Sequence, residues 1–148
     1  MILHRDLKEF VELLNDKQVE FVIVGAHALA FYGHPRYTGD LDVLIQPNQL
    51  NAERIVEVLN AFGFEQLGLK PSDFLTPGDC VQLGVPPNRI DILNAISGVS
   101  NDEIWLGKVA GTLDGIPVHF IGKKQYIANK RAIGRGKDLA DIEALGEK

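Results

Sequence analysis

Two aspartates at the start of an apolar strand constrain what this chain can fold into more than any other feature. Residues 40–45 read Asp-Leu-Asp-Val-Leu-Ile and are followed by Pro47, a pattern that predicts a strand. Residues two apart on a strand point to the same face, about 6.6 Å apart along the backbone, so the carboxylates of Asp40 and Asp42 can reach one cation or two. Unpaired, they would repel each other and be costly to desolvate, whereas Mg²⁺ takes carboxylate oxygens together with substrate phosphates.

A third aspartate lies alone between apolar residues on another candidate strand. Residues 89–93 read Arg-Ile-Asp-Ile-Leu, and the strand-like residues 81–85 precede them across Pro-Pro-Asn. This short connection predicts an antiparallel hairpin. If the strands at 40–45 and 89–93 are neighbours, Asp40, Asp42 and Asp91 converge as candidate catalytic residues and metal ligands.

A purely structural interpretation of these aspartates stays open. Asp40 can open its strand as a turn or cap residue, and the other two aspartates can each pair with an arginine such as Arg36 or Arg89. Phosphatases of the haloacid dehalogenase type and metal-dependent glycosyltransferases also use Asp-x-Asp. In those proteins the apolar strand precedes the motif, whereas here it follows, so both alternatives are weakened.

A glycine marks the boundary between the first strand and the next helix. Residues 20–24 contain a β-branched and aromatic run that predicts a buried strand, and residues 26–32 favour a short helix before Gly33. Gly25 therefore lies where the N–H groups of a helix N-terminus present roughly half a positive charge to an anion. A phosphate can dock at such a turn, although a single glycine at a strand end is also common simply because it allows the chain to turn.

The rest of the chain continues this mixture of helices and strands. Apolar residues at helical spacing predict helices over residues 4–16 and 48–62, and two short helices are expected at 123–132 and 137–145. An Asp-Gly turn signal precedes a strand at 116–121. The Gly- and Pro-rich middle, residues 68–78, predicts a loop over the site. The fold class is therefore α/β (α+β), a small mixed, partly antiparallel sheet with flanking helices.

Length and composition point to one soluble domain over residues 1–148. At 148 residues, folding can bury roughly 70% of the unfolded chain's surface. The single Cys80 excludes an intrachain disulfide framework and favours a reduced compartment, so a cytoplasmic protein is expected. We expect neither a signal peptide nor a membrane span. The net charge of −5 argues against wrapping nucleic acid over the whole surface.

Basic residues concentrate toward the C-terminus. Six of the 15 lie in a stretch without Asp or Glu: Lys123, Lys124, Lys130, Arg131, Arg135 and Lys137. This arrangement is typical of a local grip on a phosphate-bearing ligand, and a solvated helix face is the other interpretation.

Together these segments resemble the three motifs of the polymerase-β-like nucleotidyltransferase superfamily. The resemblance rests on residues 24–30 (Val-Gly-Ala-His-Ala-Leu-Ala), 36–45 (Arg-Tyr-Thr-Gly before the strand) and 89–93. Residues 127–142 resemble the fourth motif of the toxin-type branch, which contains the AbiEii/AbiGii abortive-infection toxins. The resemblance covers about residues 20–145 and implies a nucleotidyltransferase fold.

The resemblance implies an enzyme that moves a nucleoside monophosphate from a nucleoside triphosphate to an acceptor hydroxyl on RNA, protein or a small molecule. Its cofactor would be Mg²⁺ or Mn²⁺, held by Asp40, Asp42 and Asp91, with Asp91 also a candidate general base. The implied phosphate-binding residues are Gly25, Ala26, Lys130, Arg135 and Lys137. The implied supporting residues are Arg36 and Thr38, which fix the loop before the strand, and Asp138 and Asp141, which orient the cations or help the base. The same branch implies a role in a toxin–antitoxin or phage-defence system.

One departure from the family pattern motivates a second hypothesis. The first motif usually has Gly-Gly or Gly-Ser, whereas this chain has Gly25-Ala26 followed by His27. Contact with phosphate through the Ala26 backbone survives, but a side-chain hydroxyl contact does not. We also expect no appended domain that would select an acceptor. The alternative is a non-catalytic nucleotide-binding or antitoxin-like regulatory module of the same fold, with a protein partner or a homo-oligomer as its assembly.

Overall fold

Six strands form one mixed sheet in the order β3-β4-β2-β1-β6-β5. The computed structural model describes residues 5–34, 39–84 and 88–146. The strands are β1 (Phe21–Val24), β2 (Leu41–Ile45), β3 (Cys80–Leu83), β4 (Ile90–Leu93), β5 (Val109–Leu113) and β6 (Ile116–Phe120). β2 is antiparallel to β1 and parallel to β4, and β1 is parallel to β6. Antiparallel pairs, β3 with β4 and β5 with β6, form the two ends of the sheet.

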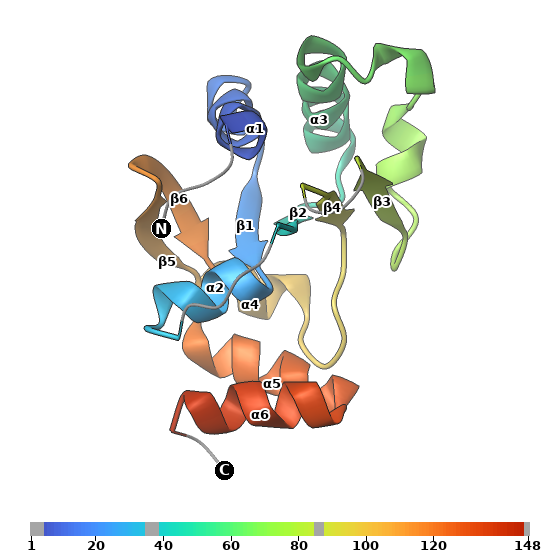
Figure 1. Ribbon diagram of the computed structural model, residues 1–148. Helices are drawn as coiled ribbons and strands as arrows, with labels where there is room; N and C mark the ends of the chain where they lie inside the picture. The colour runs from blue at the N-terminus through green and yellow to red at the C-terminus, as the bar shows by residue number, and fades with distance from the viewer. Residues whose placement is uncertain (1–4, 35–38, 85–87, 147–148) are drawn as a thin grey trace.

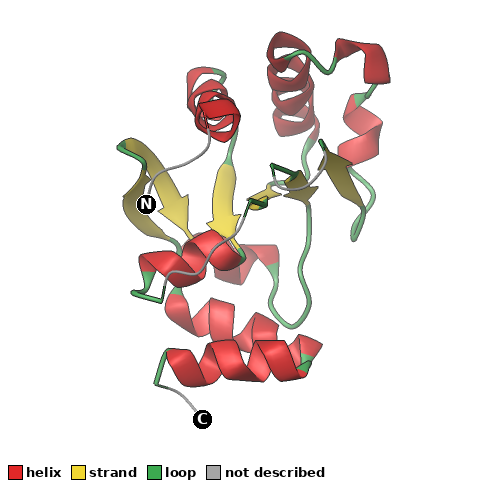
Figure 2. Ribbon diagram, viewed as in Figure 1, coloured by secondary structure: helices red, strands yellow, loops and turns green. Residues whose placement is uncertain are grey.

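Helices lie above and below the sheet in the view of Figure 1. Those above are α1 (Arg5–Asp16) and α3 (Gln49–Phe62); those below are α2 (Ala26–Phe31), α4 (Asn101–Gly107), α5 (Lys123–Ile133) and α6 (Gly136–Ala144). Two 3₁₀ helices, η1 (Glu65–Leu67) and η2 (Pro71–Phe74), follow α3 (Figure 2). None of the helices in the described ranges is long and apolar enough to cross a membrane.

The long helix α3 has clear physical start and stop signals. Its N-cap, Asn48, accepts a hydrogen bond from the backbone N–H of Asn51, and it ends at Gly63 in the left-handed conformation. The buried Asn51 side chain also bonds to the backbone of Glu20 and Gln46. The start of α3 is therefore tied both to the entrance of β1 and to the exit of β2.

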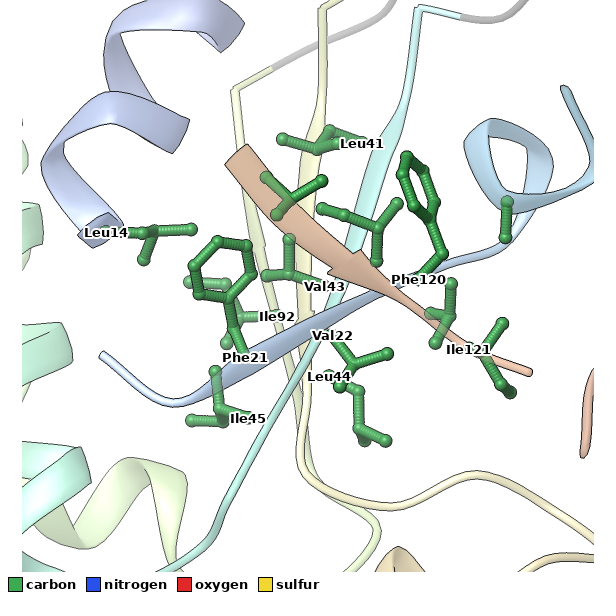
Figure 3. Close-up of a cluster of buried hydrophobic side chains, with 14 of the residues drawn as sticks. Leu14, Phe21, Val22, Leu41, Val43, Leu44, Ile45, Ile92, Phe120 and Ile121 are labelled. Atoms are coloured by element: carbon green, nitrogen blue, oxygen red, sulfur yellow. The ribbon is translucent and has the colours of Figure 1, made fainter. Parts of the chain in front are cut away.

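The central strands supply the middle of the apolar core (Figure 3). Every residue of β1 is buried, and so is every residue of β2 except Asp42. Residues from α1, β4 and β6 pack around them; those labelled in Figure 3 are Leu14, Phe21, Val22, Leu41, Val43, Leu44, Ile45, Ile92, Phe120 and Ile121. Because its neighbours along β2 are packed on both faces, Asp42 is held on a rigid element.

The predicted fold class is confirmed, but the predicted order of elements was incomplete. α4 and β5 were not predicted, and the hairpin strand expected at 81–85 is β3 at Cys80–Leu83. α4 is a short helix that buries only Ile104 among its seven residues, so its apolar period is weak. β5 has three exposed residues and a central glycine, and it forms because the Asp114-Gly115 turn pairs it with β6.

Candidate active site

Neighbouring parallel strands place two of the predicted aspartates opposite each other. In the register of β2 with β4, Asp42 lies directly across from Asp91, which is only 8% exposed. The pKa of Asp42 is raised to about 7, mainly by burial and further by a hydrogen bond with Asp91 and the charges of Asp91 and Asp40. The sheet therefore holds two carboxyl groups in contact at a cost that a bound cation would relieve.

Arg89 brings the third aspartate to the same place. Its guanidinium lies 3.2 Å from Asp40 Oδ2 and 3.0 Å from Asp91 Oδ1. The structural interpretation left open by the sequence is met for Asp91, which pairs with Arg89. Asp40, expected there as a turn or cap residue, shares Arg89, and Asp42 contacts Asp91. We call Asp40, Asp42 and Asp91 the carboxylate cluster. Arg36 and Thr38, predicted to support it, lie outside the described residues.

Gly25 lies against this cluster and is required there for two reasons. It is the N-cap of α2, with φ 71° and ψ −150°, a conformation that is essentially restricted to glycine. A Cβ atom at this position would also collide with the Asp42 carboxylate. The turn after β1 therefore brings bare backbone up to Asp42, as expected of a turn that receives a phosphate whose cation the carboxylates would hold.

Gly25→Ala is expected to destabilise the protein by about 3 kcal/mol or more, because backbone strain and overpacking add. Gly33→Ala is the matched control, since Gly33 has φ 95° but open space where its Cβ would lie; it is expected to cost about 1–2 kcal/mol. Urea denaturation of both variants measures the difference. Equal losses would contradict the close approach of Gly25 to Asp42.

A cavity of about 540 Å³ opens beside Gly25 and Asp42. Its other walls are Gly78, the segment after β4 (Ala95, Ile96 and Ser97) and the α5 residues Asn129 and Lys130, together with Val24, Leu93 and Ile133. The buried Asn94 fixes the Gly78 loop, because its side chain accepts from the Gly78 N–H and donates to the carbonyls of Phe74 and Thr76. Of the loop predicted over residues 68–78, only Gly78 is among the residues that line this cavity.

The basic wall of the cavity is held by a buried carboxylate on α6. Lys130 is 8% exposed, and its Nζ lies 3.4 Å from Oδ1 of the fully buried Asp138. Arg135 binds Asp138 at 2.7 Å through Nε and at 3.3 Å through an η nitrogen. These Arg135 hydrogen bonds, with the charges of Lys130 and Arg135, lower the pKa of Asp138 to about 2. Asp138 is therefore ionised and holds the Lys130 ammonium at the cavity.

The other predicted phosphate-binding residues divide by position. Ala26 is the first residue of α2, beside Gly25. Arg135 binds Asp138, and neither it nor the exposed Lys137 is among the residues that line the cavity. Asp141 is buried on α6, and its charge helps to raise the pKa of Arg135.

Three residues that shape the site were not predicted in the roles they have in the structure. Arg89 was considered only as a structural partner, and Asn94 gave no signal because a lone Asn after a strand is common. His27, considered for the phosphate site, is buried and hydrogen-bonded to the backbone of Asp40, and burial lowers its pKa. We infer that a neutral His27 positions the residue that precedes β2.

The donor set fits a divalent cation in kind, although it is not arranged around one. Within the described residues, no group of three His, Cys, Asp or Glu side chains is placed to hold a metal ion. Arg89 occupies oxygens of Asp40 and Asp91 instead. Asp42 and Asp91 nevertheless present touching carboxyl oxygens, the ligand type that Mg²⁺ prefers.

The mixed sheet that brings the Gly25 turn against Asp42 and Asp91 has the fold of solved nucleotidyltransferases. The chain is similar to a Thermotoga maritima protein provisionally described as a nucleotidyltransferase, with a TM-score of 0.61 and 14% identity over 95% of this chain and 89% of that one. It is also similar to lincomycin-bound lincosamide antibiotic adenylyltransferase LnuA, with a TM-score of 0.59 and 10% identity over 98% of this chain and 97% of that one.

The chain belongs to the family DUF2204, described as nucleotidyl transferase of unknown function, whose sequence model matches residues 3–148. No curated protein matches the chain. The chain is therefore a transferase of the nucleotidyltransferase type, and the two solved structures establish its fold. The finer resemblance to the AbiEii/AbiGii branch stays a prediction.

Proposed function

We propose that the chain transfers a nucleoside monophosphate from a nucleoside triphosphate to an acceptor hydroxyl, with the carboxylate cluster as its metal-binding centre. The acceptor oxygen forms a bond to the α-phosphorus while the bond from the α-phosphorus to the bridging oxygen breaks, and pyrophosphate leaves. The observation that carries this proposal is the placement of Asp42 opposite Asp91 with the Gly25 backbone against it.

Each part of the site has a task in this reaction. Mg²⁺ or Mn²⁺, when bound by Asp40, Asp42 and Asp91, supplies charge neutralisation of the triphosphate and a lower pKa for the acceptor hydroxyl. Asp91 accepts the acceptor proton. The backbone at Gly25 and Ala26 receives phosphate oxygens, and Lys130 adds a charge-assisted hydrogen bond from the opposite wall.

The roles of the remaining cations follow from their contacts. Arg135 acts by fixing Asp138, and through it Lys130, so it is a positioning residue. Arg89 neutralises Asp40 and Asp91; it contacts Oδ2 of Asp40 but both oxygens of Asp91, so Asp91 is the carboxylate that Arg89 would have to free for a cation. Lys137 is exposed and is available to a longer acceptor such as RNA or a protein.

The test is transfer of label. The protein is incubated with Mg²⁺ or Mn²⁺, one α-³²P-labelled ribonucleoside triphosphate at a time, and total RNA, lysate protein or hydroxylated small molecules as acceptors. We expect label on one acceptor class with one nucleotide, lost in Asp91→Asn and kept in Glu57→Gln on the exposed surface of α3. Absence of label with every acceptor, together with nucleotide-dependent thermal stabilisation, would replace this proposal by the non-catalytic binding module. A toxin or phage-defence role gains support only if the labelled acceptor is essential for growth.

A further inference from the structure

We infer that two copies of this chain pair through β5, edge to edge and antiparallel, about a two-fold axis at Gly111. β5 lies at one end of the sheet order, at the left of Figure 1, with β6 on its inner side and no further strand among the described residues on its outer side. Soluble proteins usually protect such an edge with a charge, a proline or a bulge. β5 reads Val-Ala-Gly-Thr-Leu and has none of these.

The register of the β5–β6 hairpin shows which backbone groups face outward. Asp114 and Gly115, both at positive φ, form a two-residue turn of the I′ type, so Leu113 and Ile116 are a hydrogen-bonded pair. Such pairs alternate along an antiparallel ladder, so Val109, Gly111 and Leu113 bond to β6. Ala110 and Thr112 then direct their N–H and C=O groups outward, and Thr112 lies opposite Pro117, which has no N–H to offer.

This outward pattern is complementary to itself. A two-fold axis at Gly111 sets Ala110 of one copy opposite Thr112 of the other, and the reverse. These are the two residues with outward donors and acceptors, so both pairs can exchange hydrogen bonds in the narrow antiparallel pattern. Gly111 meets Gly111 of the second copy at the wide, non-hydrogen-bonded position, where Cα atoms approach to about 4.5 Å. A shift of one residue would lose this match.

Charges flank the strand in the same symmetric way. Lys108 precedes β5 with extended backbone, and Asp114 follows it. The axis at Gly111 sets Lys108 of each copy opposite Asp114 of the other, so the strand carries opposite charges at its two ends and is complementary to an antiparallel copy of itself. The other edge strand, β3, is flanked by Asp79 and Gly84 and offers no such pairing.

Apolar side chains near β5 complete the surface. Val109 is 39% exposed and would lie opposite Leu113 of the second copy. The Phe31 ring, 38% exposed, stacks on Phe120 at 4.1 Å and covers Gly111, so the two Phe31 rings would approach each other beside the axis. These features favour a second copy of this chain as the occupant of the edge. β1 and β6 separate this edge from Asp42, so pairing leaves the carboxylate cluster open.

The test uses charge reversal in the intact chain. Lys108→Glu places like charges at both ends of the paired strands, and so does Asp114→Lys. We expect each change to weaken dimerisation about tenfold or more in sedimentation equilibrium. An equimolar mixture of the two variants has opposite charges at both ends again, and we expect it to form a heterodimer as tightly as the wild type forms its homodimer. Glu57→Lys on α3 is the control for altered net charge and should dimerise like the wild type.

A second variant separates the backbone pairing from the charges. Thr112→Pro removes an outward N–H without removing a bond to β6, so it should keep the far-ultraviolet circular dichroism of the wild type and yet be monomeric. A monomeric wild type across the micromolar range would overturn the inference. So would a dimer that survives all of these changes, or a mixture of charge-reversed variants that stays monomeric.

Discussion

Asp42→Asn is expected to reduce nucleotidyl transfer by a factor of about a thousand or more, equivalent to about 4 kcal/mol of transition-state stabilisation. The physical reason is the position of Asp42. It is the residue of the cluster that faces both Gly25 and Asp91, so its carboxylate joins the phosphate turn to the proposed metal site. The measurement is the rate of label transfer at saturating metal, with Asp73→Asn on the exposed surface of η2 as a control whose activity should be unchanged.

The same substitution should not destabilise the metal-free protein, and its effect should depend on pH. The folded-state pKa of Asp42 is raised from 3.8 to about 7. The folded protein therefore favours the protonated carboxyl, and this advantage is fully present below pH 4 and is lost as the pH rises through 7. Each unit of difference corresponds to about 1.4 kcal/mol. In chelator, the wild type should lose stability between about pH 4 and 7 relative to Asp42→Asn, with little further change above that range.

Adding Mg²⁺ at pH 8 provides the complementary measurement. A cation at the cluster favours the ionised carboxylates, so it should raise the thermal midpoint of the wild type and leave Asp42→Asn almost unchanged. If Mg²⁺ does not change the thermal midpoint of the wild type even with nucleoside triphosphate present, the assignment of Asp42 to a metal site is contradicted. This result would leave the fold and the Gly25 contact unaffected.

Asp138→Ala is expected to cost about 3–5 kcal/mol of folding free energy, because it leaves the buried Lys130 ammonium without its carboxylate. The loss should be larger than that of Arg135→Met, since the Arg135 side chain is 62% exposed and its removal leaves Asp138 paired with Lys130. Urea denaturation at pH 7 measures both variants. Equal losses would mean that Arg135, and not Lys130, is what Asp138 stabilises.

A double variant of Lys130 and Asp138 separates the effect of this ion pair on stability from its effect on function. Lys130→Met with Asp138→Leu removes both buried charges, so most of the stability lost in Asp138→Ala should return. Label transfer should not return, because the cavity has then lost the ammonium group that faces Gly25 and Asp42. A double variant with wild-type activity would show that Lys130 has no part in binding the nucleotide.

Local pattern was sufficient to locate the strands and helices that carry the site. The apolar run after Asp42 and the isolated Asp91 between isoleucines predicted β2 and β4, and Gly25 was predicted at its turn, because each signal lies within a few adjacent residues. The hairpin of β3 with β4 followed from its short connection. α4 and β5 could not be recognised in this way, since one buries a single residue fully and the other depends on its partner strand.

Only the tertiary structure decided which of these residues meet, because the distance between segments far apart in the chain is set by strand register and helix packing. The parallel pairing of β2 with β4 brings Asp42 to Asp91, and it places Arg89 where it binds Asp91 together with Asp40. The packing of α5 on α6 brings Lys130 to Asp138 beside the cavity, whereas Arg135 reaches Asp138 locally, three residues apart at the start of α6. The sequence by itself determined which chemical groups are available, and the fold decided which of them share a site.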